Sequence, residues 1–202
     1  MSIPSANSAE SLRAGISHFV SLKDEDWALL SSHLSIRKLK KGQQFATEGK
    51  KAREIGYVID GMFRQFYTKE GEEKTTYFFF EDSFISAYIS CLTNKPSLIT
   101  IEALSEATVI TFQYETILKL FDKSMVWQKF GRLIAEYLTI GLEERMVSLL
   151  LQNPEERYSE LLSGNKKKIL ERVPHHYVAN YLGITPVSLS RIRKRLASQK
   201  KR

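Results

Sequence analysis

Basic and hydroxyl side chains gather near the end of the sequence, in the stretch HHYVANYLGITPVSLSRIRK (residues 175–194). From residue 166 onward the sequence holds 11 Lys and Arg and one acidic residue, Glu171, whereas the rest of the chain carries a net charge of −3. Guanidinium and ammonium groups bind phosphate oxygens, and an arginine can bind the edge of a guanine through two hydrogen bonds. These residues therefore suit recognition of a polyanion, although a solvated basic tail would have the same composition.

The same stretch has the pattern of two short helices joined by a tight turn. Apolar residues stand where the helices would press together, a small residue stands at their closest approach, and Gly183 can adopt the positive φ of the turn. These apolar and small residues are Val178, Leu182, Ile184, Leu189, Ile192 and Ala179. Thr185 followed by Pro186 is a favoured helix start. The sequence predicts a helix-turn-helix, with a hairpin used only for packing as the alternative.

The second of these helices would carry the residues that read DNA. With Leu189, Ile192 and Leu196 turned inward, its other face fits the major groove of B-DNA, with the N-terminal residues at base edges. Arg191 is the candidate for a guanine contact, and the remaining cations supply sequence-independent affinity. We predict DNA contacts from Thr185, Val187, Ser188, Ser190, Arg191, Arg193, Lys194 and Arg195. The adjacent His175 and His176 point in different directions on a helix and do not suit a metal site.

The elements that must position this segment begin with a β-rich region. A short helix is expected after Ser21, and from Ile36 to about Phe112 short runs of Phe, Tyr, Ile, Val and Thr alternate with glycines. This alternation of short strand-like runs with glycines predicts a small antiparallel β barrel or sandwich. The whole is therefore expected to be an α+β protein.

A long amphipathic helix is expected after Phe121. Four large apolar residues follow a 3, 4, 3 spacing with a glycine next in register, which is typical of a coiled-coil seam. They are Trp127, Phe130, Ile134, Tyr137 and Gly141. Packing of this face on the chain's own β unit is one interpretation, and a twofold dimer through the helix is the other.

With these parts in order, the chain resembles the Crp/Fnr family of bacterial transcription regulators over roughly residues 15–197. The resemblance rests on GQQFATEGKKAREIGYVIDGMFRQFY (42–67), with Gly42, Gly49 and Gly61 at turn positions, and on YLGITPVSLSRIRKRL (181–196). It implies an N-terminal antiparallel β-roll of jelly-roll type with flanking helices, a dimerisation helix, and a C-terminal helix-turn-helix without a following β-wing. The expected domains are 1–122, 123–164 and 165–202, and the dimer interpretation of the long helix is favoured.

The resemblance also directs attention to an effector pocket. Cyclic-nucleotide-binding members of the family hold the ribose with a Gly-Glu pair and the phosphate with Arg-Ser or Arg-Thr; here Ser86-Ala87 and Ser97-Leu98 fall near those positions. A buried phosphodiester without a cation would lose its charge-assisted hydrogen bonds, so cyclic AMP is not the expected ligand. A pocket for another small molecule is predicted from Phe84, Ser86, Ala87, Tyr88, Ser97 and Leu98.

Composition argues against several other classes of function. Cys91 is the single cysteine and no histidine occurs between residues 34 and 174, which argues against a disulfide, an iron–sulfur cluster or the metal site of a cupin enzyme. We therefore expect no catalytic residues, no metal and no cofactor.

No apolar run is long enough to span a bilayer and no secretory signal is evident, so a cytoplasmic protein is expected. The leading hypothesis is a homodimeric transcription regulator that binds double-stranded DNA; the alternative is a ligand-sensing β-roll whose basic end docks RNA or an acidic protein.

Overall fold

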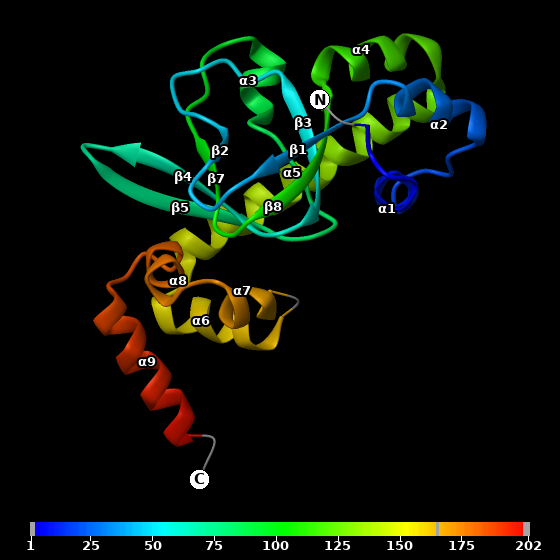
Figure 1. The fold of residues 1–202 in the computed structure, drawn as a ribbon. Helices are drawn as coiled ribbons and strands as arrows, with labels where there is room; N and C mark the ends of the chain where they lie inside the picture. The colour runs from blue at the N-terminus through cyan, green and yellow to red at the C-terminus, as the bar shows by residue number, and fades with distance from the viewer. Residues whose placement is uncertain (1–2, 165, 200–202) are drawn as a thin grey trace. The chain divides into compact units, whose positions relative to one another are not determined.

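The structure is a computed structural model, and it describes residues 3–164 and 166–199. It divides into two compact units (Figure 1). One unit holds the chain up to Gln65 together with Phe78–Ile140, and the other holds Phe66–Tyr77 together with the chain from Gly141 onward. The boundaries expected from the sequence, after residues 122 and 164, do not coincide with these, because the second unit includes a hairpin from the β-rich region.

The chain forms an antiparallel β-roll of two four-stranded sheets, and the first unit holds all of it except residues 66–77 of the β4–β5 hairpin. One sheet has the order β1-β8-β3-β6, and the other has the order β2-β7-β4-β5. The strands of the first sheet are β1 (Ser35–Leu39), β3 (Glu54–Asp60), β6 (Phe84–Ile85) and β8 (Ala107–Gln113). Those of the second are β2 (Gln44–Ala46), β4 (Phe63–Lys69), β5 (Glu72–Phe79) and β7 (Thr100–Ala103). The glycine-punctuated runs in the sequence thus form the expected antiparallel unit, and Gly42, Gly49 and Gly61 all have positive φ.

Both faces of the first sheet are buried, which explains why its strands are apolar at successive positions. Side chains alternate between the two faces of a strand. Val58 pairs with Val109 and both belong to the interior of the roll, whereas the neighbouring pair Tyr57 and Ile110 belongs to a second core on the opposite face. A shift of one residue would exchange these two sets, so the pattern fixes the register.

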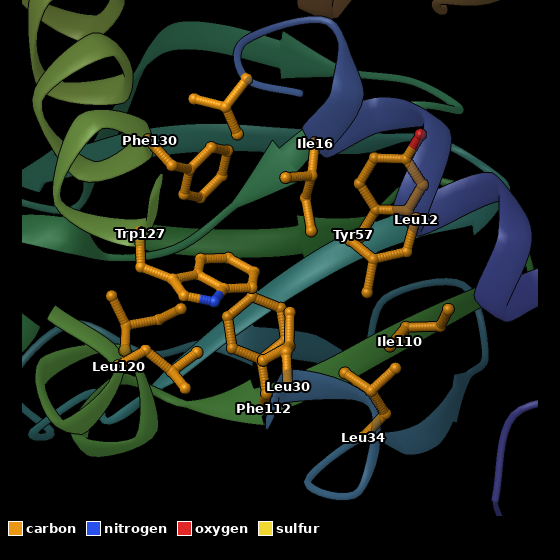
Figure 2. Packing of buried hydrophobic residues seen from close by; sticks show 12 residues of the cluster. Leu12, Ile16, Leu30, Leu34, Tyr57, Ile110, Phe112, Leu120, Trp127 and Phe130 are labelled. Atoms are coloured by element: carbon orange, nitrogen blue, oxygen red, sulfur yellow. The ribbon is translucent and has the colours of Figure 1, made fainter. Parts of the chain in front are cut away.

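Helices cover this second face of the sheet. They are α1 (Ala6–Ser17), α2 (Asp24–Ser31), α4 (Tyr114–Lys123) and the start of α5 (Met125–Leu151). Figure 2 shows side chains from these helices converging on Tyr57, Ile110 and Phe112 of the sheet. A further short helix, α3 (Tyr88–Thr93), follows β6. None of the helices in the described ranges is both long enough and apolar enough to span a membrane.

The start of α5 lies inside this core, which corrects part of the predicted dimer seam. Trp127 and Phe130 are 0% and 6% exposed, and their rings pack edge to face with centroids 5.7 Å apart. The Trp127 indole Nε1 also donates a hydrogen bond to the backbone carbonyl of Asp26 at 3.3 Å. These two residues cannot contact a partner, so their assignment to the seam was wrong. Ile134 packs at the edge of the same core, and Tyr137 is 57% exposed.

The second unit contains the tip of the β4–β5 hairpin, the end of α5 and four further helices. They are α6 (Pro154–Ser163), α7 (Lys167–Arg172), α8 (His175–Tyr181) and α9 (Pro186–Gln199). The α6 helix begins with a capping box, in which the Asn153 side chain accepts from Glu156 N and the Glu156 side chain accepts from Asn153 N. Between α8 and α9 Gly183 has a φ of +72°, so the turn has the left-handed residue that the sequence predicts.

Candidate nucleic-acid interface and effector pocket

The start of α9 is formed by the two residues that the sequence singles out for it. The Thr185 hydroxyl accepts a hydrogen bond from Ser188 N at 3.2 Å, which satisfies one of the free N–H groups of the first helical turn. Pro186 is the first residue of the helix, where its missing N–H costs nothing. The Ser188 hydroxyl lies 3.0 Å from that of Thr185. Thr185 and Ser188 therefore define the helix start and also stand at the end of the helix that the sequence predicts to contact DNA.

The two faces of α9 differ as the sequence predicts. Leu189 and Ile192 are 2% and 8% exposed and pack inward, whereas Val187 is 62% exposed. The other predicted contact residues are exposed as well, except for the half-buried Ser188. These exposed residues are Thr185, Ser190, Arg191, Arg193, Lys194 and Arg195. A ligand can therefore reach this face of the helix without rearrangement of the buried one.

The cations on this face divide into two groups by their partners. The Arg195 guanidinium binds both carboxylate oxygens of Glu155 on α6, with Nε 3.0 Å from Oε1. Arg193 Nη1 lies 2.9 Å from Nε2 of His175 at the start of α8. Arg191 and Lys194 have no side-chain hydrogen bond or ion pair within the described part of the chain. Of the three arginines predicted to contact DNA, Arg191 is the one whose side chain has no contact to break among the residues that the structure describes.

Two arginines that the sequence analysis did not identify hold the end of α8. Arg145 of α5 donates to the carbonyl of Tyr181 at 2.5 Å, and its guanidinium lies 3.9 Å from the centroid of the Tyr181 ring. Arg157 of α6 donates to the carbonyl of Leu182 at 2.9 Å. Cations stabilise the carbonyl end of a helix, so both arginines fix the turn that leads into α9. Burial lowers the pKa of Arg145, and the nearby charge of Arg157 adds to that effect.

The predicted effector pocket is only partly assembled. Ala87 is 2% exposed and lies in the interior of the roll, whereas Phe84 packs against Tyr57 of the helix-covered face with ring centroids 5.0 Å apart. Leu98 is 71% exposed. The inclusion of Phe84 and Leu98 in one pocket was therefore wrong, because strand alternation turns Phe84 outward and the loop turns Leu98 to solvent.

The hydroxyl groups of this region already have backbone partners. Ser86 Oγ donates to the carbonyl of Glu54 at 3.0 Å, and Ser97 Oγ donates to the carbonyl of Ile99 at 2.7 Å. Ser90 of α3, which the sequence analysis did not include, accepts from Ala52 N at 3.0 Å. Tyr88 packs edge to face on Tyr114 with centroids 6.0 Å apart. The bond between Ser90 and Ala52 joins α3 to the loop before β3, and a ligand here would have to compete with these hydrogen bonds.

The buried cation of the β-roll does not face this pocket. Phe63 of β4 points into the interior, so the next residue, Arg64, points to the opposite face of the sheet. There its guanidinium lies 2.9 Å from the carboxylate of Glu102 on β7, and the side chain is 3% exposed. A surface hollow of about 530 Å³ lies elsewhere, along Arg37–Leu39 and residues 42–44. Within the described ranges, no three His, Cys, Asp or Glu side chains group in a way that could hold a metal ion.

Comparison with known proteins identifies the β-roll. Residues 36–124 match the family model of the cyclic nucleotide-binding domain, which confirms the predicted type of β-roll. A search of the curated proteins found no match.

Several solved structures share the fold of most of the chain. FixK2 from Bradyrhizobium japonicum is 17% identical and has a TM-score of 0.69, with 83% of this chain and 86% of that chain covered. The catabolite activator protein of Thermus thermophilus is 20% identical with a TM-score of 0.56, covering 92% and 88%. The sensor domain of the transcriptional regulator DNR from Pseudomonas aeruginosa is 18% identical with a TM-score of 0.55, covering 71% and 94%. At these identities the likeness establishes the fold.

Proposed function

We propose that this protein is a dimeric DNA-binding transcription regulator of the Crp/Fnr type, in which α8, the turn at Gly183 and α9 form the helix-turn-helix. The observation that carries the proposal is the exposed face of α9, where Arg191 has no side-chain partner among the described residues while Leu189 and Ile192 are buried. A cyclic nucleotide-binding domain joined to such a helix pair suits a regulator that senses a small molecule. The proposal assigns the chain no catalytic reaction, metal or cofactor, and it places the protein in the cytoplasm, where the DNA is.

Base reading and phosphate binding are assigned to different residues of α9. Arg191 is the base-reading residue, since its side chain has no hydrogen bond or ion pair to break within residues 3–164 and 166–199. Lys194 and Arg193 bind phosphates, and Thr185, Val187, Ser188 and Ser190 meet base edges or the sugar-phosphate backbone at the N-terminal end. Arg195 contributes less to the affinity for DNA than its charge suggests, because a contact with DNA competes with its bidentate ion pair with Glu155.

The dimer is proposed through the second half of α5. Leu138, Leu142, Met146 and Leu149 are 38%, 68%, 48% and 48% exposed, and their spacing of 4, 4 and 3 places them along one stripe of the helix. A second copy of the chain is the proposed partner, because a twofold axis brings identical apolar stripes together and presents two reading helices to an inverted repeat. Gly141, which lies in this stretch, remains part of the proposed seam.

The effector is proposed to be a small molecule other than cyclic AMP. By the family resemblance Ser86-Ala87 and Ser97-Leu98 fall near the positions at which a nucleotide would bind, and none of these residues carries a positive charge. Arg64 does not replace the missing cation, because it lies on the other face of its sheet beside Glu102. A cyclic phosphate would therefore be buried without a charge-assisted hydrogen bond.

The proposal is tested by selection from a random library of DNA duplexes at near-physiological salt. Incubation with the purified protein, followed by sequencing of the retained duplexes, is expected to enrich an inverted repeat with half-sites about one helical turn apart. Retention without enrichment, together with preferential binding of RNA in competition at the same salt concentration, would refute the proposal. It would favour the alternative, in which the basic end docks RNA or an acidic protein.

Two single variants then separate reading from phosphate binding. Arg191→Ala is expected to cost about 1–3 kcal/mol and to relax specificity at one base pair. Lys194→Ala should weaken binding to all sequences about equally and reduce the salt dependence by roughly one phosphate contact. Lys194 is a matched control because it is exposed on the same helix and its side chain likewise has no partner in the described part of the chain. Equal losses from both variants on every sequence would contradict the role given to Arg191.

A further inference from the structure

The side chain of Asn180, near the end of α8, binds the backbone of the β4–β5 hairpin. Its Oδ1 accepts a hydrogen bond from Thr75 N at 2.6 Å, and its Nδ2 donates to the carbonyl of Glu73 at 2.8 Å. Both partners belong to β5, which is an edge strand of its sheet. The hairpin tip and α8 are parts of the same compact unit. We refer to this pair of hydrogen bonds as the Asn180 clasp.

The geometry of a β-strand explains why a carboxamide fits here. The carbonyl of one residue and the N–H of the residue two positions later point to the same edge of the strand. An edge strand leaves such groups unpaired, and the asparagine side chain supplies one donor and one acceptor in a plane, as a peptide group does. Asn180 therefore stands in for a neighbouring strand at Glu73 and Thr75. Aspartate has the same shape but supplies no donor.

The clasp completes a set of contacts that hold three consecutive residues of the helix end. The side chain of Asn180 is bound to the hairpin, and the carbonyls of the next two residues are bound by Arg145 and Arg157. The turn at Gly183 and the start of α9 follow directly. The reading face remains open in this arrangement, since Val187 is 62% exposed. The clasp thus fixes the helix pair without covering it.

We propose that Asn180 is a positioning residue for DNA recognition, which holds α8 against the hairpin tip so that α9 presents Arg191 in a set direction. This inference rests on the proposed function. In a dimer, two reading helices must meet two half-sites at once, and a helix pair that is already oriented loses less conformational freedom on binding. The second half-site is bound intramolecularly, so its contribution depends on geometry. The clasp therefore contributes to the binding of an inverted repeat and hardly at all to that of an isolated half-site.

The test uses the full chain with Asn180→Ala and Asn180→Asp, and with His176→Ala as the control. His176 is an exposed residue of the same helix. Binding to the inverted repeat from the library selection and to a duplex with a single half-site is measured by fluorescence anisotropy. We expect both Asn180 variants to lose about tenfold or more in affinity for the inverted repeat and less than about twofold for the half-site. The control should bind both duplexes as the unsubstituted protein does.

Hydrogen exchange reports on the clasp independently of DNA. The amide of Thr75 is expected to exchange slowly in the unsubstituted protein and in His176→Ala, and faster in both Asn180 variants, with unchanged melting temperatures. Unchanged exchange at Thr75 would overturn the clasp itself. Equal losses on both duplexes, no loss, or tighter binding by the variants would overturn the positioning role. If the unsubstituted protein binds no duplex, the proposed function falls and the positioning role with it, while the exchange data still show whether the clasp forms.

Discussion

Replacement of Gly183 by alanine tests the turn between α8 and α9. Gly183 has a φ of +72°, which costs an alanine about 1–2 kcal/mol. A Cβ at this position would meet only Arg157 Nη2, at 3.8 Å, so it adds no steric penalty. Alanine also lowers the conformational entropy of the unfolded chain, which stabilises the folded state by about 0.4–1 kcal/mol. We therefore expect Gly183→Ala to lower the free energy of unfolding by about 1 kcal/mol, which is the difference between these two effects.

The stability change expected for Gly183→Ala lies between those expected for alanine at two other glycines. Gly141 lies within α5 with nothing of its own chain within 4 Å of an added Cβ, so at protein concentrations that keep the chain monomeric Gly141→Ala should stabilise it by about 0.5–1 kcal/mol. Gly61 has a φ of +99°, and an added Cβ would lie 2.6 Å from the carbonyl oxygen of Glu106. Gly61→Ala combines strain with overpacking and should cost about 2–5 kcal/mol.

Urea unfolding followed by circular dichroism, at one fixed protein concentration, measures the series. Gly183→Asn should be more stable than Gly183→Ala, because asparagine tolerates the left-handed conformation better. If Gly183→Ala were as stable as Gly141→Ala, the turn could not have the backbone conformation described above, and the helix-turn-helix assignment would lose its central residue.

Four further measurements test the core, the proposed dimer helix, a buried tyrosine and the cysteine. Trp127→Ala should cost about 3–5 kcal/mol in urea unfolding at every protein concentration, because the side chain is fully buried in its own chain. Leu142→Ala should instead raise the dissociation constant of the dimer in sedimentation experiments; an effect of Trp127→Ala on dimerisation alone would restore the original seam. Burial raises the pKa of Tyr57 from 10.0 to about 12, so the folded state holds this proton more tightly than the unfolded state. The contribution of this proton to the free energy of unfolding should therefore be fully present below pH 10 and be lost as the pH rises from 10 to about 12. Tyr57→Phe should flatten this decline in unfolding measurements. Burial also raises the pKa of the Cys91 thiol, so a disulfide reagent should modify it more slowly in the native protein than in urea; equal rates would show that the thiol is accessible.

The sequence predicted correctly those structural features that depend on residues close together in the chain. The cap at Thr185 and the positive φ of Gly183 depend on residues within one helical turn of each other, and the structure confirms both. The strands of the β-roll were likewise visible, because each combines a short apolar run with a turn residue. The type of β-roll followed from the family resemblance and is confirmed by the match over residues 36–124.

Contacts between distant residues were the part that could not be predicted. The 3, 4 spacing through Trp127 and Phe130 shows that one face of the helix is apolar, but the same spacing fits a partner helix or the chain's own sheet. Arg195 was expected to bind phosphate, yet its partner Glu155 lies 40 residues away. Arg145 gave no signal, because it follows the exposed pair Glu143 and Glu144 on a helix, and its role depends on the end of a helix that comes later in the chain.

The Asn180 clasp also has a consequence for synthesis. Thr75 leaves the ribosome 105 residues before its partner Asn180, which at about 5–20 residues per second is a delay of about 5–20 seconds. During that interval the N–H of Thr75 lacks its Asn180 acceptor and can pair with another nascent chain. The second unit is built from a hairpin and a segment far apart in the sequence, so it cannot be completed until nearly the whole chain has emerged. Expression of the segment from Gly141 alone would lack the strand that receives Asn180, and deletion of that segment would leave the strand edge uncovered for the lifetime of the protein.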